Sequence, residues 1–175
     1  HIYNLVNPMR RIPVNERPGL MSAAKEHGLE YSADNGVTGW DESAYYQFSE
    51  REIGEDIEAP AEELEGMCME VADRAISNES VLQRLGIPEH YWDYIANSWR
   101  SSDRNLYGRM DLSYDGNGPA KFLEYNADTP TALYETAVFQ WEWFEQATEM
   151  GLIPAGGDQL NDVHESIVQA FPFLG

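Results

Sequence analysis

Two segments that read as short β-strands, separated by glycines, constrain the fold of this chain more than any other feature. Residues 105–115 (NLYGRMDLSYD) and 119–127 (PAKFLEYNA) flank the tripeptide GNG at residues 116–118. Glycine and asparagine between two strands are the usual signal of a β-hairpin. The sequence therefore predicts an antiparallel strand pair, which a two-residue loop at Asn117 and Gly118 would close most regularly.

A long helical pattern precedes the hairpin. Ser49 and Glu52 have the spacing of a capping box, which would begin a helix over residues 49–78. Pro60 either breaks this helix or starts a second one, because proline is tolerated in the first turn but not in the interior. Four apolar residues recur at helical spacing and predict a buried stripe: Leu64, Met67, Val71 and Ala75.

Four other segments predict helices. They cover residues 15–28, with Gly28 as a C-cap, and residues 87–101, 132–151 and 158–171. Together with the strand pair they predict an α+β fold, in which helices pack on an antiparallel β-hairpin or sheet.

The charge of the chain limits its partners. Acidic residues number 31 against 11 basic ones, which gives a formal net charge of −20. Such a surface repels DNA, RNA and anionic lipid, and attracts cations and basic ligands. Two interpretations stay open: the acidity serves solubility alone, or it serves a polycationic substrate or a bound metal.

The cysteine content and the hydropathy bear on location. Cys68 is the one cysteine, so a disulfide framework is impossible and the chain fits the reducing cytoplasm. No apolar run reaches the roughly 20 residues that span a bilayer. We therefore expect a cytoplasmic protein without membrane or nucleic-acid partners.

Four polar side chains share one face of the predicted hairpin, because alternate residues of a strand point the same way. Arg109 and Asp111 lie together on the first strand, and Glu124 and Asn126 on the second. A two-residue loop places Asp111 opposite Glu124 and Arg109 opposite Asn126. A loop with an odd number of residues would instead present Lys121, Leu123 and Tyr125, so the register stays open at this point.

The facing carboxylates would repel one another at cross-strand distance. A protonated carboxyl group, a bridging arginine or a divalent cation could offset that repulsion. Two carboxylates and an amide form a hard-oxygen ligand set that suits magnesium or manganese, and a poor zinc site. Two other interpretations are an exposed hairpin with a salt-bridged surface, and a hydrolase that uses Asp111 and Glu124 as an acid–base pair.

The segment after the second strand adds hydroxyl groups. Thr129, Pro130 and Thr131 precede the helix predicted from residue 132. They fit an ordinary N-cap. They equally fit an anion site, where a substrate carboxylate or phosphate could dock against free backbone N–H groups.

At these residues the sequence resembles a known family. The stretch LYGRMDLSYDGNGPAKFLEYNADTPTALYETAVFQW is similar to the synthetase domain of glutathionylspermidine synthases, an ATP-grasp ligase in a permuted arrangement. NERPGL, CMEVADRAI and IPEHYW are similar as well, so the likeness runs over residues 9–175 and is closest to the shorter branch without an amidase domain. Residues 1–8 are expected to be an upstream extension.

The resemblance implies roles for the hairpin residues. Arg109 matches the residue that contacts glutathione and is the expected catalytic side chain. Asp111, Glu124 and Asn126 match the magnesium ligands. The cofactor implied is Mg, with ATP as a substrate.

Two departures from the family pattern limit what carries over. Thr129 and Thr131 match small hydroxyl residues near the glutathione, but this chain has TPTALYE in place of a serine-rich segment without proline. The family's nucleotide-binding lysines and glycine-rich loop have no counterpart in residues 132–175. We therefore expect the N-terminal part of a synthetase domain, the front part of an ATP-grasp-like ligase, which would not turn over ATP alone.

The intact enzyme implied by the resemblance is an ATP-dependent carboxylate–amine ligase. ATP phosphorylates a glutathione-like carboxylate, and the amine of a polyamine such as spermidine attacks the acyl-phosphate and releases phosphate. The partners are then small molecules, and the oligomeric state stays open. The alternative is a non-catalytic acidic module that binds a polyamine or a divalent metal.

Overall fold

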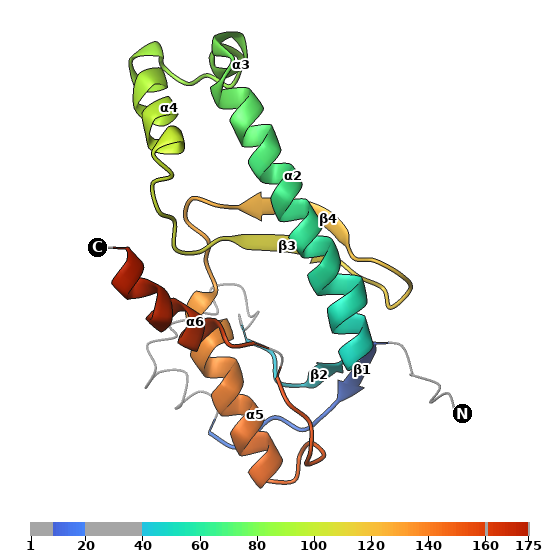
Figure 1. Ribbon diagram of the computed structural model, residues 1–175. Coiled ribbons are helices and arrows are strands. Elements are labelled where there is room, and N and C mark those ends of the chain that lie inside the picture. Colours follow the sequence, from blue (N-terminus) through green and yellow to red (C-terminus); the bar gives the residue numbers. More distant parts are fainter. Residues whose placement is uncertain (1–8, 20–39, 160, 175) are drawn as a thin grey trace, which may run out of the picture. The chain divides into compact units, whose positions relative to one another are not determined.

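The computed structural model describes residues 9–19, 40–159 and 161–174. It confirms the α+β class, with helices and two small antiparallel sheets (Figure 1). The chain divides into two compact units. The first unit comprises His1–Glu52 and Thr131–His164, and the second comprises Ile53–Pro130 and Glu165–Gly175.

The first unit contains a strand pair and a helix. Strands β1 (Arg10–Pro13) and β2 (Ala44–Gln47) pair in antiparallel fashion. A π-helical turn, η3 (Glu135–Phe139), continues directly into α5 (Gln140–Glu149). This helical segment matches the prediction for residues 132–151 apart from its first residues.

A buried ion pair lies in the interior of the first unit. Arg17 Nε donates to Glu42 Oε1 at 3.0 Å, and both side chains are almost fully buried. Arg17 Nη1 also donates to Gln146 Oε1 on α5 at 2.9 Å, and the guanidinium lies over the ring of Phe139. Trp40 packs against Phe139 in a T-shaped arrangement of the two rings. The charge of Arg17 is thus paired and hydrogen-bonded, as a buried charge must be.

This ion pair explains one wrong prediction. Residues 15–19, predicted as the start of a helix, form an irregular segment and a turn, while residues 20–28 lie outside the described residues. Pro18 disfavours the helical conformation of the residue before it. That residue, Arg17, instead turns its side chain inward to Glu42.

The predicted capping box is confirmed. Glu52 N donates to Ser49 Oγ at 3.2 Å, and Ser49 N donates to Glu52 Oε2 at 2.9 Å. The following helix has a π-helical start, η1 (Glu52–Glu58), and continues as α2 (Ala59–Ile76). Pro60 lies in the first turn of α2, where the π-helical segment changes to an α-helix, and it does not break the helix.

The remaining helices of the second unit follow α2. They are α3 (Glu79–Arg84), the short η2 (Glu89–Tyr91) and α4 (Trp92–Arg100). Asn78 caps α3 by accepting a hydrogen bond from Ser80 N at 3.1 Å. These elements confirm the helix predicted over residues 87–101, with its first turn as a 3-10 helix.

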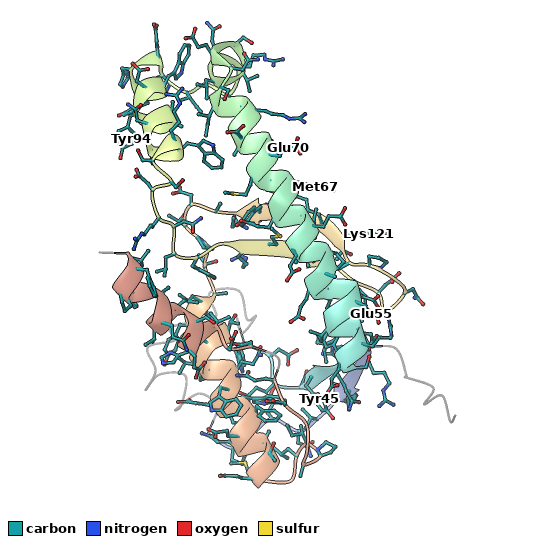
Figure 2. The ribbon with its side chains drawn as sticks, in the orientation of Figure 1. Tyr45, Glu55, Met67, Glu70, Tyr94 and Lys121 are labelled. Atoms are coloured by element: carbon teal, nitrogen blue, oxygen red, sulfur yellow. The ribbon has the colours of Figure 1, made fainter. Side chains whose placement is uncertain are left out.

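The predicted buried stripe of α2 is wrong at its centre. Met67 and Val71 are 50% and 66% exposed, and no residue of α2 is buried. Met67 is labelled on α2 in Figure 2. Trp99 Nε1 of α4 donates to Asp73 Oδ1 at 2.9 Å, near the C-terminal end of α2. Within the described part of this unit, α4 therefore meets the end of α2 and leaves the middle of the stripe open.

The last predicted helix is shorter than expected. It comprises α6 (Val163–Ala170) and the 3-10 turn η4 (Phe171–Phe173), whereas the prediction began at residue 158. Asn161 Oδ1 accepts from Val163 N at 3.3 Å, so an asparagine turn precedes the helix. Among the described residues, none of the helices has both the length and the apolar character that crossing a membrane requires.

Candidate metal and substrate site on the β3–β4 hairpin

The predicted hairpin forms, with the register that brings the four polar residues together. Strand β3 (Arg109–Ser113) pairs with β4 (Lys121–Asn126) in antiparallel fashion beside α2 (Figure 1). Arg109 is opposite Asn126, and Asp111 is opposite Glu124. Because alternate residues of a strand point the same way, the two pairs share one face of the hairpin.

The loop that was expected to set this register is absent. Residues 114–120, not Asn117 and Gly118 alone, connect the strands, and the pairs next to the loop are Ser113 with Lys121 and Leu112 with Phe122. If this pairing continued along the strands without a shift in register, Leu123 would lie opposite Asp111. A β-bulge between Asp111 and Leu112 leaves Leu123 without a partner and restores Glu124 to that position.

Contacts with η1 explain the longer connection. The carbonyl of Asp56 accepts from Ala120 N at 2.7 Å, and its carboxylate accepts from Tyr114 Oη at 2.8 Å. Both ends of the loop are therefore held by one buried residue. Gly116 and Gly118 have φ angles of +83° and +78°, so the loop takes a left-handed backbone that glycine adopts without strain.

Arg109 and Asp111 form a two-point ion pair on the shared face. Arg109 Nε donates to Asp111 Oδ1 at 2.7 Å, and Nη2 donates to Oδ2 at 3.1 Å. Their side chains are 32% and 34% exposed. These hydrogen bonds lower the pKa of Asp111 and raise the pKa of Arg109, against the opposing effect of partial desolvation. Glu124, which is opposite Asp111 across the strands, contributes to both pKa shifts.

Glu124 and Asn126 make the second contact of the site. Asn126 Nδ2 donates to Glu124 Oε1 at 2.8 Å. Glu124 is exposed, and Asn126 is half-buried. The face thus holds two carboxylates, a guanidinium and an amide, so its carboxylates outnumber its cation by one.

The donor set fits a hard divalent cation. No three histidine, cysteine, aspartate or glutamate side chains of the described residues gather as a metal site. Here the third oxygen donor would be the amide of Asn126, beside the carboxylates of Asp111 and Glu124. Carboxylate and amide oxygens suit Mg²⁺, which keeps several waters and needs few protein ligands. The chemistry of the set therefore agrees with the ligands expected from the resemblance.

Two residues that the sequence analysis missed hold the hairpin in place. Tyr125 lies between Glu124 and Asn126 on β4. Burial, and next the neighbouring Glu65 of α2, raise the pKa of Tyr125 to about 12. A Cβ atom on Gly108 would lie 2.6 Å from Tyr125 Cε2. Only glycine fits there without a shift of the ring. A glycine just before a strand was the available signal for such a close approach.

The two threonines fall in different units. Thr129 is an exposed residue of the second unit after β4, and Thr131 begins the second segment of the first unit. The carbonyl of Ala132 accepts from Thr136 N at 3.1 Å, so Ala132 and not Thr131 occupies the N-cap position of the helix that follows. The role of the threonines beside a substrate stays a prediction.

The family model described as the pre-ATP-grasp part of glutathionylspermidine synthase matches residues 11–175. The chain therefore belongs to the glutathionylspermidine synthase family, and the resemblance seen in the sequence is confirmed.

Two relatives have names that bear on function. The chain is 36% identical over 161 residues to a Haemophilus influenzae protein provisionally named as an acid–amine ligase. The aligned region covers 90% of this chain and 39% of the relative. It is 31% identical over 84 residues to the trypanothione synthetase of Crithidia fasciculata. That aligned region covers 47% of this chain and 13% of the relative. The chain thus spans well under half of the length of either relative.

Proposed function

We propose that this chain is the part of an ATP-dependent acid–amine ligase that holds Mg²⁺ and the acidic substrate. The observation that carries the proposal is the paired register of β3 and β4, which puts Arg109 and Asp111 on one face with Glu124 and Asn126. Family membership and the name of the Haemophilus influenzae relative support the reaction class.

The metal would be held by Asp111, Glu124 and Asn126. When bound there, Mg²⁺ would neutralise negative charge on the phosphate oxygens of ATP. The bulge at Leu123 has a role in this arrangement, because it aligns the two carboxylates across the strands. The close approach of Gly108 to the ring of Tyr125 helps to fix the same strands.

The acidic substrate would be held by Arg109. A guanidinium presents two parallel N–H groups to a carboxylate, the geometry that Arg109 shows with Asp111. Next to the reacting carboxylate it would stabilise the negative charge that develops there. Thr129 and Thr131 would add hydroxyl groups to the binding of the acid.

The substrates proposed are a glutathione-like acid and an amine of the polyamine type, such as spermidine. ATP phosphorylates the carboxylate of the acid, and the amine nitrogen then attacks the acyl carbon, forms the amide and releases phosphate. The relative named trypanothione synthetase supports a synthetase reaction. The net charge of −20 supports a polycationic amine, through long-range attraction that salt screens.

Mass spectrometry of the ligated product tests this function. The intact protein would be incubated with ATP, Mg²⁺, glutathione and a panel of mono-, di- and polyamines. We expect an amide product, formed with equimolar loss of ATP, and its loss on removal of ATP or Mg²⁺. Amine binding that needs no nucleotide, without product from any amine, would instead identify a non-catalytic acidic module.

A further inference from the structure

We propose that Arg109 and the divalent cation compete for Asp111, so that the acidic substrate and the cation bind cooperatively. This inference rests on the function proposed above and concerns the regulation of the same site. Arg109 would then have two roles, because it would hold the acid and would also keep the cation site closed until the acid arrives.

The observation behind it is the state of Asp111 in the structure. Each of its two carboxylate oxygens accepts a hydrogen bond from Arg109, at 2.7 and 3.1 Å. On the opposite strand, β4, Glu124 Oε1 accepts from the amide nitrogen of Asn126 at 2.8 Å. Both oxygens of Asp111 and one oxygen of Glu124 thus accept hydrogen bonds from donors within the hairpin.

Competition follows from charge. Asp111 carries a single negative charge, which the guanidinium already offsets, and a divalent cation on the same carboxylate would lie close to that guanidinium and be repelled. If Arg109 turned away, Asp111 and Glu124 would face one another as two unscreened carboxylates. That opposed pair is unfavourable without a cation and favours binding of one.

A substrate carboxylate can relieve this competition because it resembles Asp111 chemically. It offers the guanidinium the same two-point hydrogen bonding, so Arg109 exchanges one carboxylate for another at little cost. The pair is about one-third exposed, at 32% and 34%, so an incoming acid can reach it. Partly exposed ion pairs contribute little to stability, so breaking the contact between Arg109 and Asp111 costs the fold little.

Coupling between two ligands is reciprocal. If the acid tightens cation binding by a given factor, the cation must tighten acid binding by the same factor, and such factors are commonly about 5 to 150. The ligase would then retain Mg²⁺ and ATP phosphates firmly only when its acid is present, which limits hydrolysis of ATP without product.

The test is a titration with Mn²⁺, followed by the electron paramagnetic resonance of the free ion, on the intact protein without nucleotide. In the wild type, saturating glutathione should tighten Mn²⁺ binding by about 5-fold or more. Arg109→Gln should bind Mn²⁺ about 5-fold more tightly than the wild type without glutathione, and glutathione should no longer change that affinity.

A matched control separates competition from net charge. Arg104→Gln makes the same change of charge in the same unit, at an exposed arginine outside both strands. It should retain the wild-type affinity within about 2-fold and the full response to glutathione, because distant exposed charges are screened. Arg109→Lys keeps the charge but cannot bind two oxygens in parallel, so its Mn²⁺ affinity should fall between those of the wild type and Arg109→Gln.

The outcomes separate the two proposals. Loss of Mn²⁺ binding in Asp111→Asn and Glu124→Gln would support the metal site. If Arg109→Gln then binds Mn²⁺ no more tightly than the wild type, or if its affinity still responds to glutathione, competition is refuted and the metal site stands. If the wild type does not bind Mn²⁺, or if neither carboxylate variant weakens binding, the metal site itself fails and competition fails with it.

Discussion

The close contact between Gly108 and Tyr125 leads to a prediction about stability. In Gly108→Ala the new Cβ would lie 2.6 Å from Tyr125 Cε2, closer than carbon atoms approach without displacement. The ring of Tyr125 is half-buried, which opposes its rotation out of the way. Overpacking of this kind costs about 1–3 kcal/mol. Because the φ angle of Gly108 is not left-handed, alanine also recovers about 0.4–1 kcal/mol from the unfolded chain.

The net expectation is a loss of about 1–2 kcal/mol in the free energy of unfolding, measured by urea denaturation with tryptophan fluorescence and circular dichroism. Gly66→Ala is the matched control, because Gly66 lies within α2 and a Cβ there would meet nothing within 4 Å. It should stabilise the protein by about 0.5–1 kcal/mol. A second variant isolates the contact: Gly108→Ala should cost nothing in a Tyr125→Ala background. Equal losses in both backgrounds would contradict the packing argument.

Three further predictions concern the site and the capping box. In the intact protein, Asp111→Asn and Glu124→Gln should each reduce Mg²⁺-dependent ATP hydrolysis at least about 100-fold, because each removes a metal ligand. The control Asp103→Asn should stay active. Full activity in both Asp111→Asn and Glu124→Gln would refute the metal assignment. Arg109→Ala should chiefly raise the KM for the acidic substrate, by about 10-fold or more, and unchanged turnover at low glutathione would contradict its role. Ser49→Ala removes the hydroxyl that accepts from Glu52 N and should lower the free energy of unfolding by about 1 kcal/mol, measured by urea denaturation; an unchanged midpoint would show that the cap contributes nothing.

Features set by neighbouring residues could be predicted from the sequence. The capping box of Ser49 and Glu52 depends on residues three apart, and the structure has both of its hydrogen bonds. The alternation of Arg109 with Asp111 along one strand is equally local. Each of these predictions needed only the geometry of a single element.

Features set by distant contacts could not be predicted in this way. The register of the hairpin is the expected one, but a bulge at Leu123 and a longer loop produce it. That loop is held by Asp56, which the sequence places 58 residues before Tyr114. The periodicity of α2 correctly predicted a helix, but it cannot state what covers Met67, which is half exposed.

The bulge also provides a practical means of observing the site. Leu123 has no partner across the strands and is 64% exposed, while its neighbour Glu124 faces Asp111. A thiol introduced at this position could carry a spin label or a fluorophore without replacing any paired residue. Cys68 is the single thiol of the sequence, and its replacement by serine would make the labelling specific. The extra residue that aligns the carboxylates therefore marks the point from which their occupancy can be recorded directly.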